Sequence, residues 1–246
     1  MDNQSSSPTC PVSKSEKINS AKCPVKHDKH QDDQHSASNK VSTATIESLE
    51  IDPVNNMPNL PQQMHQNQQV PLSTEREISS IPRQINAEVD SHMLKNTDEN
   101  SNYWEYPSPQ QFYNALMRKG QGVEEHHIDT VVQIHNFLNE GAWKEVLKWE
   151  SLHRECKIHK LISLQGRPDD LSPKARIYGW FGGAKPFDRH DWYVDRCGKK
   201  VRYVIDYYEA PSEDGNPAFN LDVRPALDSF ESLVSRVKML FKSDEK

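Results

Sequence analysis

The chain has 246 residues, of which 34% are hydrophobic and 27% charged, and its formal net charge is −6. A general nucleic-acid-binding protein usually carries a basic excess, so this balance argues against a nucleic-acid partner. No apolar run reaches the length of a membrane-spanning helix, and the N-terminus lacks the apolar centre of a secretory signal. The first arginine is Arg76, so we do not expect a usual, arginine-rich mitochondrial presequence.

Composition divides the chain into a polar N-terminal part and a folded remainder. Residues 1–70 are rich in Ser, Gln, Asn and Pro, and we expect a long disordered tail there. The segment 72–78 is more mixed and is suited to docking on the folded part. Aromatic residues begin at Tyr103, and all five tryptophans lie between positions 104 and 192. We therefore expect one compact domain over 71–246.

The first predicted helix has a clear start and stop. Ser108 is a good N-cap, Pro109 suits the first helical position, and Gln111 completes a capping box. Gly120 is expected to end this helix.

Two further helices are predicted over 124–137 and from Glu140 to about Cys156, with Asn139 as the cap between them. At 100° per residue, one stripe of the later helix gathers four apolar or thiol side chains and one histidine. These are Ala142, Val146, Trp149, His153 and Cys156.

The pattern then changes to β. Residues 192–194 and 201–208 read as strands, and 197–200 reads as the hairpin connection between them. A last helix is predicted to begin near Pro225, with one buried face formed by Leu227, Phe230, Val234, Val237 and Leu240. The expected fold class is α+β, with several helices and a small antiparallel sheet.

Four cysteines are too few for a disulfide scaffold, so we expect free thiols or haem ligands. Cys10 and Cys23 each begin a Cys-Pro-Val tripeptide in the tail. A Cys-Pro thiolate can serve as an axial ligand of haem iron. The alternative is two chance thiols in a low-complexity segment. Cys156, three residues before His159, is treated as structural, because one such pair is a weak metal signal.

His153 is the candidate iron ligand of the folded part, with Trp149 placed to shield the porphyrin; the alternative is a core histidine bound to a carbonyl group. Arg196 and Arg202 are candidate partners for carboxylates, or else residues of a solvated strand face. The charged and aromatic segment 186–192 either holds substrate or forms an internal salt-bridge network.

Three stretches together resemble the holocytochrome c synthase (cytochrome c haem lyase) family. They are Leu72–Pro82 followed by Trp104–Ser108, then Asn139–His153, and then Pro186–Tyr208 followed by Arg224–Asp228. The resemblance covers about 70–240, and the two Cys-Pro-Val tripeptides match haem motifs common in that family's tails. One departure follows Cys156, where relatives often carry more cysteine and proline than Lys157–Lys160 supplies.

The resemblance implies a carbon–sulfur lyase that joins haem b to apocytochrome c through thioether bonds. It also implies a single unit of mixed helices and a small sheet. The implied location is the mitochondrial intermembrane space, peripherally on the inner membrane, reached without a cleaved presequence. The family's iron-ligating histidine falls on His153, and His190 is a second matching histidine.

Two other functions use the same features. A haem-binding chaperone or sensor would carry haem without forming bonds, and a scaffold on the inner membrane would use the aromatic residues only structurally. The substrate of the synthase is either soluble cytochrome c, the membrane-anchored respiratory c-type cytochrome, or both.

Overall fold

A computed structural model describes residues 51–52, 57–58, 61–66, 68–84, 102–212 and 218–243. A four-stranded antiparallel sheet in the order β5-β6-β7-β8 forms its centre. The strands are β5 (His159–Gly166), β6 (Asp188–Arg196), β7 (Lys199–Ala210) and β8 (Ala218–Pro225). The helices are α2 (Pro109–Arg118), η3 (Glu125–His127, a 3-10 turn), α3 (Ile128–Glu150), α4 (Pro173–Trp180) and α5 (Phe230–Ser243). Two short pairs complete the described elements, β1 (Ile51–Asp52) with β2 (Met57–Pro58), and β3 (Ile78–Pro82) with β4 (Tyr103–Glu105).

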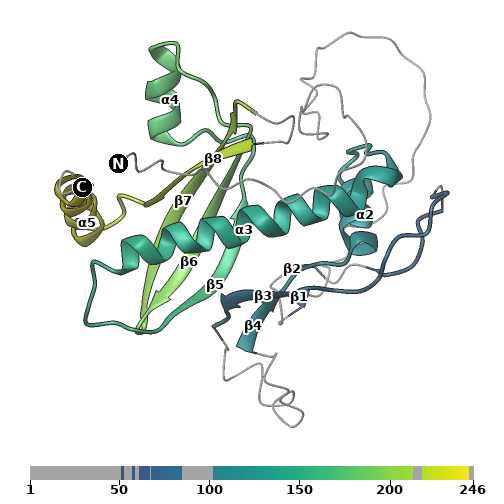
Figure 1. Cartoon of the computed structure of the whole chain (residues 1–246), viewed down its shortest axis with the longest axis horizontal. Helices are drawn as coiled ribbons and strands as arrows, with labels where there is room; N and C mark the ends of the chain where they lie inside the picture. The colour runs from purple at the N-terminus through teal and green to yellow at the C-terminus, as the bar shows by residue number, and fades with distance from the viewer. Residues whose placement is uncertain are drawn as a thin grey trace, which may run out of the picture.

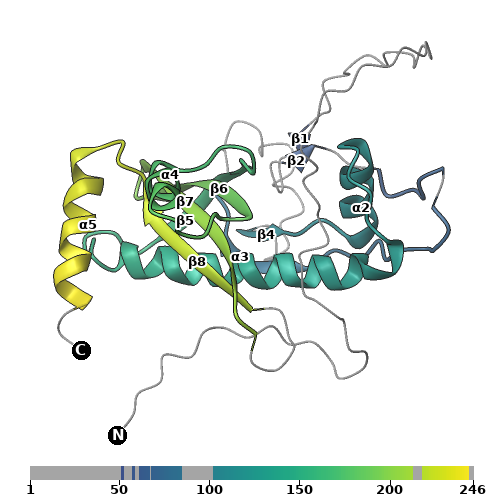
Figure 2. The same cartoon turned by 90° about the horizontal axis from the view of Figure 1, so that it is seen from above.

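The long helix α3 lies across one face of the sheet, as Figure 1 shows. The main core forms between them, where Trp143 and Val146 of α3 meet Trp192, Val194 and Tyr203 of the sheet. Figure 2 shows α2 at one end of α3 and both α4 and α5 toward the other end. A smaller core joins α2 to the start of α3. The expected α+β domain of helices and a small antiparallel sheet is confirmed.

The capping box predicted for α2 is present. The Ser108 hydroxyl accepts a hydrogen bond from the Gln111 amide, and the Gln111 side chain accepts one from the Ser108 amide. Gly120 follows the helix with φ +71°, the left-handed conformation that glycine adopts without a Cβ clash. The segment 72–78 docks on the folded part as expected, since Leu72 packs against the smaller core. Gln68 is also buried and bonds to Gln110, which the polar composition did not indicate.

The two helices predicted on either side of Asn139 are one continuous helix, α3. The predicted break at Asn139 is wrong because the next residue, Glu140, is bonded to residues that lie outside the helix. Its carboxylate accepts hydrogen bonds from Ser79, Ser80 and Tyr106. Gly141 lies close to β8, where an added Cβ would stand 3.4 Å from Leu221 Cδ1. Packing against β3 and β8 therefore carries the helix through its weak point.

The predicted hairpin of β6 and β7 is confirmed, with Cys197 and Gly198 as its two-residue turn, both at positive φ. The segment 186–192 runs into strand β6, where Arg189 pairs with Asp191. This confirms the internal salt-bridge alternative for the segment.

The last helix is present, but it begins at Phe230 and not near Pro225, because Pro225 ends β8 and Leu227 lies in the turn between them. Its predicted orientation is also wrong. The apolar stripe expected to be buried faces outward, and Leu227, Phe230, Val237 and Leu240 are exposed. The polar face packs inward through Ser232 and Ser235. Periodicity identified the stripe correctly, but it does not reveal what covers it. None of the described helices combines the length and the apolarity needed to cross a membrane.

Candidate haem site

His153 lies in a tight turn just beyond α3, three residues past the helix end at Glu150. Its amide donates to the Glu150 carbonyl at 2.9 Å, and its carbonyl accepts from the Cys156 amide at 3.1 Å. The predicted helical stripe through His153 and Cys156 therefore does not form, although Ala142 and Val146 do face the core. Only 8% of His153 is exposed.

The imidazole of His153 faces α5. Its Nε2 is 2.9 Å from the Ser235 hydroxyl, and its Nδ1 is 3.4 Å from a Glu155 carboxylate oxygen and 3.5 Å from one of Glu231. Burial lowers the pKa of His153, and the Arg196 charge lowers it further. A neutral imidazole is the form that ligates a metal. Burial and the Arg196 charge therefore favour the neutral ring, and α5 lies against it.

A buried ion network joins the end of α3 to the sheet and to α5. Arg196 donates two hydrogen bonds to the Glu150 carboxylate at 2.6 and 2.8 Å, and a third to Glu231 at 2.6 Å. The Tyr203 hydroxyl donates to the same Glu150 carboxylate at 2.6 Å. Burial raises the pKa of Glu150, but the hydrogen bonds from Arg196 and Tyr203 and the Arg196 charge outweigh it, so the net pKa is lowered. This network fixes the position from which the His153 turn departs.

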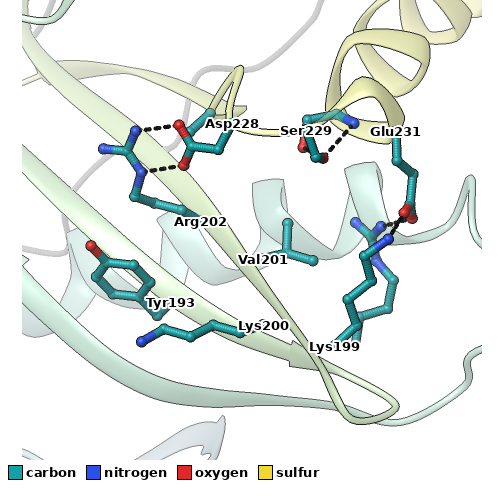
Figure 3. A pocket seen from close by; sticks show the side chains of 11 residues that line it. Tyr193, Lys199, Lys200, Val201, Arg202, Asp228, Ser229 and Glu231 are labelled. Atoms are coloured by element: carbon teal, nitrogen blue, oxygen red, sulfur yellow. Dashed lines mark hydrogen bonds and ion pairs between the residues drawn. The ribbon is translucent and has the colours of Figure 1, made fainter.

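A pocket of about 270 Å³ opens beside this network, between the β6–β7 hairpin and the start of α5 (Figure 3). Four basic side chains line it, namely Arg196, Lys199, Lys200 and Arg202, against the two acidic residues Asp228 and Glu231. Glu231 belongs both to the pocket and to the surroundings of His153. This volume is below the range of about 300–1,000 Å³ for pockets that enclose a whole ligand, so the pocket has room for only one edge of a large ligand.

Arg202 binds Asp228 through two hydrogen bonds at 2.6 and 2.7 Å and also donates to Asp191 at 2.7 Å. The hydrogen bond to Asp228 is the main cause that raises the pKa of Arg202. Arg196 is similarly engaged with protein carboxylates. Lys200 lies over the Tyr193 ring, 4.3 Å from its centroid, on the same side of the pocket (Figure 3). Both predicted arginines therefore line the pocket, and each already bonds to carboxylates of the chain.

The Trp149 side chain is directed at β8, and His190 lies farther back along β6 than the pocket-lining Arg196. The Trp149 indole donates to the Val223 carbonyl of β8 at 2.7 Å and packs on the main core. His190 is six residues before Arg196 on β6, or about 20 Å along the strand. Its Nε2 is 3.2 Å from Asp188. Cys10 and Cys23, the two predicted tail ligands, lie outside the described residues.

A disulfide joins Cys156, three residues after His153, to Cys197, the residue after Arg196. It connects the turn that carries the histidine with the tip of the hairpin that lines the pocket. The expectation of free thiols or haem ligands at these two positions is wrong. Sequence reasoning also missed Glu150, Ser235 and Glu231. Two signals in the sequence could have found part of this arrangement. The folded part contains two cysteines, which could pair with each other, and Glu150 is an acidic residue at the end of an apolar helix stripe.

Comparisons with known proteins agree on one family. The family described as "Cytochrome c/c1 heme lyase" matches residues 1–240. The chain is 46% identical over 198 residues to the holocytochrome c-type synthase of Gallus gallus, covering 77% of this chain and 67% of that protein. It is 40% identical over 241 residues to the holocytochrome-c synthase of Saccharomyces cerevisiae, covering 87% and 84%. It is 43% identical over 205 residues to the Homo sapiens holocytochrome c-type synthase, covering 80% and 71%.

No solved structure matches this fold significantly. The resemblance noted in the sequence is confirmed, and the protein is an enzyme of the carbon–sulfur lyase class. The chain belongs to the cytochrome c/c1 heme lyase family.

Proposed function

We propose that this enzyme attaches haem b covalently to apocytochrome c, with His153 as a ligand of the haem iron. The observation that carries the proposal is the environment of His153. A nearly buried imidazole with a lowered pKa lies beside a pocket lined by four basic side chains. Haem presents the matching chemistry, because its iron binds imidazole and its propionates bind cations.

Iron can reach Nε2 of His153 only after the Ser235 hydroxyl has left it, since the two atoms are 2.9 Å apart. The proposed binding step therefore includes the release of this contact between α5 and the His153 turn. With Nε2 on the iron, Nδ1 remains directed at the carboxylates of Glu155 and Glu231. A carboxylate behind a ligating histidine orients the ring and strengthens it as a ligand.

The bond-forming step is the addition of two substrate thiols to the two vinyl groups of haem. The Cys-x-x-Cys-His segment of apocytochrome supplies its histidine to the second face of the iron, which places both thiols beside the vinyls. Each sulfur bonds to one vinyl carbon and the proton goes to the other carbon, so nothing leaves and no net oxidation occurs. The protein contributes alignment, and the thiols must be reduced for the reaction. Release follows when the folded product replaces His153 with its own second ligand.

Soluble cytochrome c is the proposed first substrate, with the membrane-anchored c-type cytochrome as a second. The proposed location is the mitochondrial intermembrane space, peripherally on the inner membrane. The Cys156–Cys197 disulfide supports a compartment that is oxidising enough to keep such a bond.

The decisive experiment is co-expression with apocytochrome c in a bacterium that lacks its own c-type maturation system, followed by haem staining of a denaturing gel. The full chain should give a stained cytochrome, and His153→Ala should give none. His127→Ala is a matched control, because that histidine is exposed on the 3-10 turn at the far end of α3. Each variant is checked for folding by its unfolding midpoint. A stained cytochrome from folded His153→Ala enzyme would remove His153 from the proposal.

The same experiment tests the runner-up, a haem chaperone or sensor. A purified protein that carries haem through His153 but leaves the cytochrome unstained with either substrate would favour the carrier. A protein with no haem absorbance would favour the scaffold.

A further inference from the structure

Two apolar surfaces of the described chain face solvent. On α5, Phe230, Leu233, Val237 and Phe241 point away from the domain, and Phe230 is 80% exposed. Ser235, only 3% exposed, faces the domain instead. A surface helix of a soluble domain normally buries its apolar stripe, so this reversed orientation indicates that the stripe contacts something outside the fold.

The second surface lies on α4 and the residue after it. Trp180 is 82% exposed and Phe181 is 86% exposed, and Ile177 and Tyr178 beside them are also exposed. The base of α4 is firmly attached, because its N-cap Ser172 donates to Asp206 of β7 at 2.6 Å. The aromatic tip is therefore held on a fixed helix. Both views place α4 and α5 at the same end of the molecule, where α3 ends (Figures 1 and 2).

The charge around these surfaces indicates the kind of partner. Segments 173–185 and 230–243 contain six basic residues and one acidic residue, a net charge of +5. Because the whole chain carries −6, all other residues together carry −11. Arg176, Lys185 and Lys238 are exposed in these segments. The two segments are positively charged and therefore complement a negatively charged surface. The remaining residues are negatively charged and would instead suit a basic protein partner.

We propose that the aromatic tip of α4 and the outward face of α5 together dock the enzyme on a bilayer containing anionic lipid. Trp, Tyr and Phe side chains are favoured at the boundary between headgroups and acyl chains, and nearby Lys and Arg attract anionic headgroups. A helix with an apolar outer face and basic flanks lies in that boundary without crossing the membrane. The proposal rests on the proposed peripheral location and assigns the surface responsible.

Docking through α5 also connects the membrane to the haem site. Ser235 on the inner face of α5 holds Nε2 of His153, and Glu231 on the same helix lines the pocket. A bilayer that binds the outer face of α5 would thus act on the helix whose contact with His153 must be released before iron can bind.

The test is sedimentation of the full chain with phosphatidylcholine vesicles with and without about one fifth cardiolipin, a doubly anionic lipid. The chain should bind the anionic vesicles, and binding should weaken as NaCl is raised. Trp180→Ser/Phe181→Ser should weaken binding at least about tenfold, because two large apolar side chains lose their burial in the bilayer. Phe230→Ser/Phe241→Ser should act similarly. Met64→Ser is the matched control, since this exposed apolar residue belongs to the segment that packs beside α2, at the other end of α3.

Trp180 provides a second readout. The other four tryptophans are buried or half-buried, so lipid with brominated acyl chains should quench mainly Trp180 fluorescence. Trp180→Phe should bind vesicles nearly normally but lose most of the quenching.

Equal binding by all variants, or no quenching on bound vesicles, would overturn the proposal. The proposal would also be overturned if the chain did not bind vesicles but formed dimers, or a complex with apocytochrome, that the same serine substitutions disrupt. Haem staining separates the two proposals, because a chain that matures cytochrome but ignores vesicles refutes only the docking surface.

Discussion

The Cys156–Cys197 disulfide closes a loop with a sequence separation of 41 residues. By the chain-entropy relation, a cross-link over this length stabilises the folded state by about 4 kcal/mol at 25 °C. The double variant Cys156→Ser/Cys197→Ser should therefore unfold with a free energy lower by about that amount. Reduction of the unaltered protein should have the same effect, and Cys197 is exposed enough for a reductant to reach it.

Urea unfolding of the full chain, followed by tryptophan fluorescence, measures this difference. The oxidised chain, the reduced chain and the double variant are compared, and Cys10→Ser/Cys23→Ser is the matched control, with an expected change within about 0.5 kcal/mol. If the double variant loses less than about 1 kcal/mol, or if the reductant also destabilises the double variant, the disulfide does not constrain the unfolded chain as inferred.

The bond should also matter locally. It ties the turn that carries His153 to the residue after Arg196. Hydrogen exchange at the amides of Leu152 and His153, both bonded to carbonyls at the end of α3, should accelerate in the double variant. Haem binding should weaken in parallel. Unchanged exchange at these amides would show that the buried ion network alone holds the turn.

Three further outcomes are expected. Glu150→Leu should cost about 3–5 kcal/mol in urea unfolding, because it leaves the Arg196 charge buried with only part of its compensation, whereas replacing both residues by apolar ones should cost much less. Ser235→Ala should speed haem binding measured by stopped-flow absorbance, since His153 loses the contact that occupies Nε2; a slower rate would show that Ser235 orients the ring instead. For Glu140, burial raises the pKa, but hydrogen bonds from three hydroxyls and one amide give a net lowering. The stability contributed by this carboxylate is therefore complete above about pH 4.5 and is lost as the pH falls through its folded value, so Glu140→Gln should flatten the acid limb of a stability profile.

Local chemistry in the sequence determined several elements correctly. Ser108, Pro109 and Gln111 specify the start of α2 whatever packs against it, because a capping box satisfies backbone groups within one turn. The β6–β7 hairpin is similarly local, since Cys197 and Gly198 supply a two-residue turn between strands rich in β-branched and aromatic residues. His153 was singled out by residue type and by resemblance. Its role as a ligand stays a prediction, as do those of Trp149 and His190.

Distant contacts decided the surroundings of that histidine. No spacing rule links Glu150 to Arg196 or Cys156 to Cys197, because strand β5 and helix α4 lie between the members of each pair and only the folded sheet brings them together. The same is true of Ser235, which reaches His153 across 82 positions. Without these contacts the sequence predicts a helix that continues to Cys156.

The last helix shows most clearly what the sequence determines and what it leaves to the tertiary structure. Its 3.6-residue period marks an apolar stripe, and the stripe is real. The period alone does not distinguish a stripe covered by the protein's own core from one covered by another surface, because apolar burial is non-directional. The tertiary structure decides the matter by packing Ser232 and Ser235 inward and leaving Phe230 and Phe241 outside.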